Sequence, residues 1–171
     1  TSDDGSTSTK AFTIALTDAN DNTPTYATNK GTQTINEFDE GSAQTVDTVS
    51  ITDADLDATN NNACTLGGND AGDFTCTVSD SEYVLTFTNA PDFENPADSD
   101  TDNVYSVTVT INDGSNTGST ISYSITISDL NDETPSYTSS DTTPDVVEGQ
   151  TAVETVAITD ADALDLSLIH I

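Results

Sequence analysis

The chain has 171 residues, of which 31 are acidic and only 2 are basic, so that its net charge is −29. Nucleic acids and anionic membranes bind positively charged surfaces. Lys10 and Lys30 cannot supply such a surface, so we exclude nucleic acid as a partner and expect the chain to attract cations. Its apolar residues lie in alternating runs, which favours a folded protein over a disordered one.

Side chains that alternate between apolar and polar predict β-strands, because period two puts the apolar set on one face of a sheet. We predict seven strands in the central part of the chain, near residues 33–37, 44–52, 63–67, 73–78, 82–88, 103–112 and 119–128. No window shows the period of an amphipathic helix. Seven strands in about 110 residues indicate an all-β fold, an immunoglobulin-like Greek-key β-sandwich.

The second predicted strand departs from strict alternation, because Val46, Val49 and Ile51 shift phase by one residue. The same shift occurs further along the chain at Val153, Val156 and Ile158. A phase break shared by two copies predicts a β-bulge, or a strand that crosses between two sheets.

Two motifs recur about 110 residues apart, which is the signature of tandem domains. Asp18-Ala19-Asn20-Asp21 returns as Asp129-Leu130-Asn131-Asp132, and Asp53-Ala54-Asp55 returns as Asp160-Ala161-Asp162. We therefore predict three pieces. Residues 1–22 are the C-terminal strand and linker of a preceding repeat, residues 23–133 are a complete repeat, and residues 134–171 begin a following repeat. The apolar tail, 166–171, breaks the pattern and is interpreted as an artefact of how the sequence ends.

The acidic motifs fall at predicted strand ends, so they can gather at the two poles of a sandwich. Calcium takes six to eight oxygen ligands from carboxylates, amide carbonyls and backbone carbonyls. Transition metals prefer His or Cys, of which the chain has one and two. Asp and Asn also favour turns, and for any single motif that interpretation is equally good. Four kinds of motif that recur in the same order favour calcium.

A set of five motifs resembles the cadherin repeat. In chain order they are Glu-Gly, Asp-Ala-Asp, Asp-Phe-Glu, an Asp before Gly and Asp-x-Asn-Asp-x-x-Pro. The run Pro91-Asp92-Phe93-Glu94-Asn95-Pro96 looks like the cadherin-like repeats of large microbial surface proteins. The resemblance covers the chain to about Asp165 and implies tandem sandwiches with Ca²⁺ held between neighbours, which rigidifies a rod. It also implies an extracellular protein, anchored in the membrane in its full length, whose partners are neighbouring repeats of the same chain and other cell-surface proteins or glycans.

The resemblance further implies ligands for two junctions between repeats. Those of the first junction are Asp18, Asn20, Asp21, Asp53, Asp55, Asn62 and Asp113. Those of the second junction are Glu40, Asp92, Glu94, Asp129, Leu130 through its carbonyl, Asn131, Asp132, Asp160 and Asp162. Glu37 competes with Glu40 for its position, because this loop is one residue longer than its later copy. The chain has no Trp, so the tryptophan-based strand exchange of vertebrate cadherins is not implied, and the adhesion partner stays open.

Cys64 and Cys76 lie on consecutive predicted strands. In an oxidising exterior they can form a disulfide that adds about 3 kcal/mol to stability, and the alternative is a pair of buried thiols.

Two other functions compete with a calcium-stiffened rod. An accessory module that binds carbohydrate or another ligand would need aromatic platforms on an exposed face, whereas most Tyr and Phe occupy predicted core positions. A hydrolase would need a carboxylate pair in a cleft. No cleft-forming architecture is evident in the sequence, so we expect a protein that is not an enzyme.

Overall fold

The computed structural model describes residues 3–27, 32–36, 44–55, 62–79, 81–138, 145–151 and 157–162. Within these ranges, eight strands build a sandwich of two sheets. They are β1 (Thr25–Tyr26), β2 (Thr32–Asn36), β3 (Thr45–Thr52), β4 (Ala63–Gly67), β5 (Phe74–Val78), β6 (Glu82–Phe87), β7 (Val104–Asn112) and β8 (Thr117–Ser128). A short 3-10 helix, η1 (Ala71–Asp73), precedes β5, and β9 (Ser136–Tyr137) pairs with β10 (Ile158–Thr159) beyond the sandwich.

The two sheets have the strand orders β1-β3-β6-β5 and β2-β8-β7-β4. Neighbouring strands are antiparallel, except that β2 runs parallel to β8. Strands far apart in the sequence, such as β3 and β6, therefore lie side by side, as in an immunoglobulin-like Greek key. The predicted fold class is confirmed.

The core lies between the sheets and consists of the side chains that the alternation placed on one face. They are Val49, Ile51, Phe74, Tyr83, Leu85, Phe87, Tyr105, Val107, Val109, Ile111, Ile121, Tyr123, Ile125 and Ile127. Burying an apolar side chain of this size contributes about 1.5–3 kcal/mol. The polar residues that alternate with the core residues on β7 and β8 face away from the core. Because these two strands are anchored in the core, their ends hold the adjoining loops in place.

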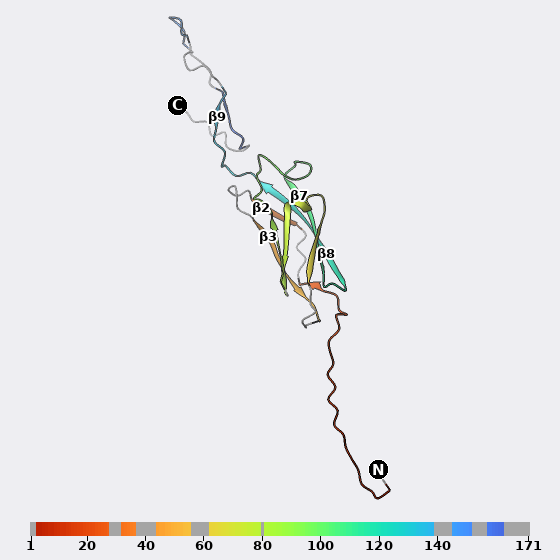
Figure 1. The fold of residues 1–171 in the computed structure, drawn as a ribbon. Helices are drawn as coiled ribbons and strands as arrows, with labels where there is room; N and C mark the ends of the chain where they lie inside the picture. The colour runs from red at the N-terminus through yellow and green to blue at the C-terminus, as the bar shows by residue number, and fades with distance from the viewer. Residues whose placement is uncertain are drawn as a thin grey trace.

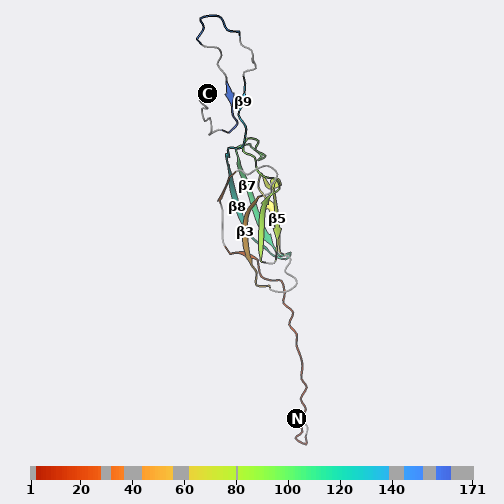
Figure 2. The ribbon, with the colours of Figure 1, turned by 90° about the vertical axis from the view of Figure 1, so that its left-hand side faces the viewer.

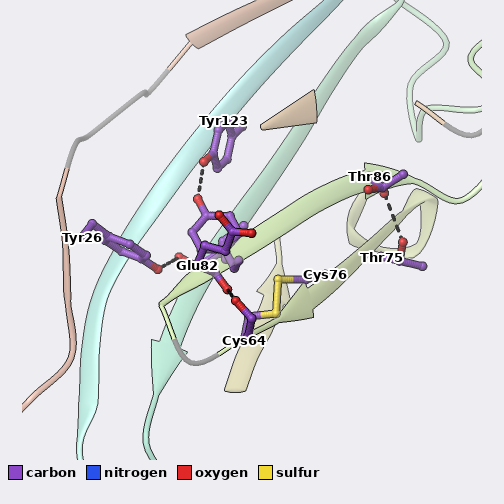
Figure 3. Close-up of a disulfide and its surroundings, with 10 residues drawn as sticks. Tyr26, Cys64, Thr75, Cys76, Glu82, Thr86 and Tyr123 are labelled. Atoms are coloured by element: carbon purple, nitrogen blue, oxygen red, sulfur yellow. Dashed lines mark hydrogen bonds between the residues drawn. A yellow bond between two sulfur atoms is a disulfide. The ribbon is translucent and has the colours of Figure 1, made fainter. Parts of the chain in front are cut away.

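The phase break in β3 is a β-bulge, because the pairing with β6 shifts between Thr45 and Asp47. The bulge turns Asp47 into the core, where the Tyr123 hydroxyl donates to its Oδ2 at 3.1 Å. The hydroxyls of Tyr83 and Tyr123 also share a hydrogen bond (Figure 3). Burial raises the pKa of Tyr83 to about 12, which keeps this buried hydroxyl neutral and able to donate.

The seven predicted strands match β2 to β8 to within two residues at each end. The predicted strand in residues 1–22 is different, because the structure assigns no strand within residues 3–22, the described part of this segment. Phe12, Ile14 and Leu16 are 76%, 81% and 94% exposed. A strand exists only beside a hydrogen-bonded neighbour, and no described segment pairs with these residues.

The segments that flank the sandwich leave it from opposite ends. Figures 1 and 2 show residues 3–24 running away from one pole and the chain after β8 running away from the other. The ends of β3 and β7 thus lie at the first pole, beside the incoming segment. The end of β8 and the start of β7 lie at the second pole.

Cys64 and Cys76 form a disulfide, with an S–S distance of 2.01 Å and a Cα–Cα distance of 6.3 Å. Cys64 is on β4 and Cys76 is on β5, which belong to different sheets. The bridge drawn in yellow in Figure 3 therefore joins the two sheets of the sandwich at one edge.

Candidate metal centres

Three acidic side chains meet at the first pole. Asp53, Asp55 and Asp113 each offer a carboxylate oxygen, and the three oxygens lie within 4.8 Å of one another. Asp55 is 2% exposed and Asp113 is 1% exposed, so these two carboxylates are largely removed from water. We call these three residues the first-pole cluster.

The ends of two core strands bring this cluster together. β3 ends at Thr52, and the Asp55 N–H donates to Asp53 Oδ1 at 3.1 Å, which folds the Asp-Ala-Asp segment into a tight turn. β7 ends at Asn112, and Asp113 Oδ1 accepts the backbone N–H groups of Ser115 at 2.7 Å and Asn116 at 2.5 Å. Burial favours the neutral acid, but these hydrogen bonds prevail and lower the pKa of Asp113.

The incoming linker is attached to the same cluster. The Asn22 backbone N–H donates to Asp55 Oδ2 at 2.7 Å, and its side-chain amide donates to Asp55 Oδ1 at 2.5 Å. The Asn20 amide donates to the Asp113 carbonyl at 3.1 Å. The Asn116 amide lies within hydrogen-bond distance of Asn20 Oδ1, the Asn22 carbonyl and Asp113 Oδ2. The cluster therefore forms where the linker meets the sandwich.

A second group of acids meets at the opposite pole. Glu94, Asp129 and Asp162 offer oxygens that lie within 4.8 Å of one another, and Asp162 is 2% exposed. We call these residues the second-pole cluster. Glu94 comes from the Asp-Phe-Glu motif, Asp129 directly follows β8, and Asp162 comes from the segment after β10. Residues on either side of the predicted repeat boundary thus share one site.

The two poles repeat one hydrogen-bond pattern. The Glu133 N–H donates to Asp162 Oδ2 at 3.1 Å, as the Asn22 N–H donates to Asp55 Oδ2. The Asp162 N–H donates to Asp160 Oδ1 at 3.3 Å, as Asp55 does to Asp53. The sequence repeat is therefore also a repeat of local geometry.

Both clusters fit a calcium ion by the chemistry of their donors. Asp53 Oδ2 and Asp162 Oδ1 are buried and accept no hydrogen bond, which is costly for a carboxylate oxygen unless a cation is near. In the described part of the chain Lys10 is the sole Lys or Arg, and its ammonium lies 5.4 Å from the Phe12 ring. No described cationic side chain therefore neutralises either cluster, and all the donors are the hard oxygens that Ca²⁺ prefers.

Other predicted ligands of the first junction lie around the first-pole cluster. Asn62 precedes β4, whose Ala63 pairs with Asn112, so the register puts Asn62 opposite Asp113. Asn20 contacts Asp113 through its amide, as described above. Asp21 is exposed and accepts a hydrogen bond from the Asn22 amide, and Asp18 is exposed and outside the cluster.

The other predicted ligands of the second junction are less closely gathered. Asp160 is half-buried beside Asp162, and Leu130 is 39% exposed. Asp92 Oδ1 accepts the Asn95 N–H at 2.9 Å, which is the turn role that the sequence left open. Asn131 and Asp132 are exposed, and Asp132 is not part of the second-pole cluster. Glu40 and its competitor Glu37 lie outside the described residues.

The structure also identifies residues that the sequence reasoning missed. Asn22 and Asn116 bind the first-pole cluster. Asn22 occupies a variable position of the Asp-x-Asn-Asp-x-x-Pro motif, where the second copy has Glu133. Glu133 occupies the equivalent position in the second copy and acts through its backbone N–H. A residue that acts through its backbone leaves no side-chain signal in the sequence.

A carbohydrate-binding module would need an exposed aromatic face, and the described part of the sandwich has none. Phe74, Phe87 and Tyr105 pack against one another in the core, with ring centroids 4.4–6.0 Å apart. The exposed aromatic side chains among the described residues are Phe12 and Tyr137, which lie in the two flanking segments.

No protein-family model matches the chain, and no curated protein matches its sequence. Solved structures do match its fold. Human CDH23 EC21-23 has 25% sequence identity and a TM-score of 0.58, and the match covers 86% of this chain and 46% of that one. The human desmocollin-1 ectodomain has 18% identity and a TM-score of 0.55, with 73% and 24% covered. Protocadherin gammaB7 EC3-6, solved as a cis-dimer, has 23% identity and a TM-score of 0.57, with 85% and 34% covered.

The chain therefore has the fold of a cadherin-like repeat, as the motifs predicted. It spans about a quarter to a half of the length of these solved structures. The described residues include no helix that could span a membrane.

Proposed function

We propose that the chain is a calcium-binding segment of an extracellular adhesion or surface-stalk protein. In this proposal Ca²⁺ binds at each junction between repeats and stiffens the rod that the repeats form. The observation that carries the proposal is the position of the two acidic clusters. Each lies where a flanking segment meets the sandwich, and the two lie at opposite poles.

The electrostatics of the junctions support a switch between a flexible and a stiff state. Two like charges about 4.8 Å apart repel by ~1 kcal/mol in water and by ~3 kcal/mol at an effective dielectric constant near 20. Three carboxylates make three such pairs, so each junction carries a repulsive energy among its own acids. One Ca²⁺ replaces these repulsions with attractions and ties both sides of the junction to one ion.

The resemblance to extracellular cadherin domains and the disulfide between Cys64 and Cys76 both favour an oxidising location outside the cell. We propose that the full-length protein is anchored at the cell surface. Neighbouring repeats of the same chain are the partners that the junction sites imply. Further partners, such as other surface proteins or glycans, would bind the exposed faces of the rod.

The proposal is tested by comparing the chain in calcium and in chelator. Thermal unfolding followed by circular dichroism should give a higher melting temperature in calcium. Small-angle X-ray scattering should give an extended, narrow distribution of shapes in calcium and a broader one in chelator. A matched variant, Asp55→Asn with Asp162→Asn, should remove most of both differences. Identical unfolding and scattering of the unaltered chain in the two buffers would reject the proposal.

A further inference from the structure

A third group of carboxylates lies in the loop between β6 and β7, apart from the two clusters described above. Asp98, Asp100 and Asp102 occupy alternate positions, and each offers an oxygen within 4.8 Å of the others. Asp98 is 3% exposed, whereas Asp100 and Asp102 are exposed. The group is therefore open to solvent on one side and closed by the protein on the other.

The loop backbone is curved so that the three carboxylates converge. The Asp102 N–H donates to Asp98 Oδ2 at 2.9 Å, and the Val104 N–H donates to Asp102 Oδ1 at 2.9 Å. Thr101 and Asn103 have φ angles of 57° and 62°, in the left-handed region that few residues other than glycine adopt. The sandwich thus holds an unusual backbone shape at this loop.

The buried carboxylate of this group has an oxygen without a hydrogen bond, which indicates that a ligand binds there. Asp98 Oδ2 accepts the Asp102 N–H, but Asp98 Oδ1 is buried and accepts no hydrogen bond. Asn103 Oδ1, in the same loop, is also buried without a hydrogen bond, although the Asn103 amide donates to the Phe93 carbonyl at 2.9 Å. Such atoms are costly in a folded protein unless an ion or water binds them.

The surrounding charges are also negative. The carboxylates of Asp98, Asp100 and Asp102 converge, and no described cationic side chain lies among them. Asp70 braces the loop, because its two oxygens accept the backbone N–H groups of Ser99 at 2.8 Å and Ser106 at 2.6 Å. These bonds occupy both oxygens of Asp70, which makes it a positioning residue for the loop.

The spacing of the group matches a known pattern of calcium loops, in which carboxylates at the first, third and fifth positions bind the ion and a sharp turn follows at the sixth. Asp98, Asp100 and Asp102 correspond to the first, third and fifth positions. Asn103 corresponds to the sixth position and supplies the turn with its positive φ. We propose that Asp98, Asp100 and Asp102 form a third calcium site, which belongs to the repeat itself and does not require a neighbouring repeat.

This site has a consequence for the second pole. The Asn103 amide holds the carbonyl of Phe93, the residue between Asp92 and Glu94. A Ca²⁺ ion that orders the loop would therefore also fix the segment that carries Glu94 into the second-pole cluster.

The site is tested by calcium titration of the full chain with isothermal titration calorimetry, and circular dichroism checks that each variant is folded. Asp100→Asn changes an exposed side chain and should remove one calcium equivalent, or weaken that equivalent by about tenfold or more. Asp98→Asn should act in the same way. Asp145→Asn, an exposed Asp outside all three groups, is the matched control and should bind as the unaltered chain does.

Two further variants separate this site from the junction sites. The double variant Asp55→Asn with Asp162→Asn weakens both poles and should retain one calcium equivalent. Adding Asp100→Asn to it should abolish that equivalent. Nuclear magnetic resonance should show calcium-dependent shifts of the amides of residues 98–104 in the double variant. If Asp100→Asn binds calcium with the same stoichiometry and affinity as Asp145→Asn, the third site does not exist, whatever the poles do.

Discussion

Replacing Asp53 by Asn separates the electrostatic cost of the first-pole cluster from its capacity to bind calcium. Asp53 Oδ1 accepts the Asp55 N–H at 3.1 Å, and the Oδ1 of an Asn can keep this bond. Asp53 Oδ2 is buried and accepts no hydrogen bond. An amide nitrogen in its place would donate to the neighbouring carboxylates, so the variant should lose repulsion and keep the turn.

The variant should be more stable than the unaltered chain without calcium, and it should lose most of this advantage with calcium. Removing one charge eliminates two of the three repulsive pairs in the cluster. At ~1 kcal/mol per pair, the free energy of unfolding in chelator should rise by about 2 kcal/mol. In calcium at about 100 times the dissociation constant, one site stabilises the unaltered chain by about 2.7 kcal/mol. A dissociation constant weakened about 10- to 100-fold would reduce this gain to about 1.4–0.4 kcal/mol.

The assay is thermal unfolding of the unaltered chain and the variant, each in calcium and in chelator. For a domain of this size, 1 kcal/mol corresponds to about 4–8 °C, so the rise in chelator should be near 10 °C. Glu82→Gln is the matched control, because Glu82 is an exposed acid of β6 outside the clusters and should change both melting temperatures little. A variant that is less stable than the unaltered chain in chelator would refute the electrostatic reasoning.

Three further predictions concern the sandwich itself. Replacing both Cys64 and Cys76 by Ala should lower the free energy of unfolding by about 3 kcal/mol, measured by urea denaturation, because the bridge closes a loop with a sequence separation of 12. Since burial raises the pKa of Tyr83 to about 12, the unfolded chain loses this proton near pH 10 while the folded chain keeps it. Stability is therefore intact below pH 10 and should fall by up to about 1.4 kcal/mol per pH unit between pH 10 and 12, a slope that Tyr83→Phe should reduce in alkaline denaturation. Gly118→Ala should destabilise by about 1–3 kcal/mol in the same urea assay, because its new Cβ would lie 2.4 Å from the Pro24 carbonyl oxygen.

Much of the fold was predictable because each sandwich strand buries one face. Tyr105, Val107 and Val109 alternate with polar residues, and this alternation located β7 to within one residue. The bulge at Asp47 was visible as a phase break, although the reason for it was not. The Tyr123 hydroxyl that meets Asp47 comes from β8, 76 positions away.

The sequence predicted the kind of ligand atoms at the candidate sites better than it predicted which residues form each site. Repetition found Asp53, Asp55 and Asp162, because a copied motif stands out from ordinary turn residues. Repetition could not find Asn116, which reaches the first-pole cluster only because the turn after Asp113 folds back. Asp98 has no copy within the 171 residues, so only its buried oxygen and the convergence of the loop distinguish it.

The division into three pieces and the ligand sets as a whole stay predictions. They share one physical requirement, namely that acids on both sides of a junction approach closely enough to bind one ion. The second-pole cluster is the clearer example of a site shared across a junction. Asp129 belongs to the end of the sandwich, whereas Asp162 comes from the segment after β10.

A crystal structure of the chain grown in calcium would test the central claim most directly. We predict one ion at each pole, with oxygens of Asp53, Asp55 and Asp113 at one site and of Glu94, Asp129 and Asp162 at the other, about 2.3–2.6 Å from the metal. Carboxylates that point apart at both poles, with only water between them, would contradict the account.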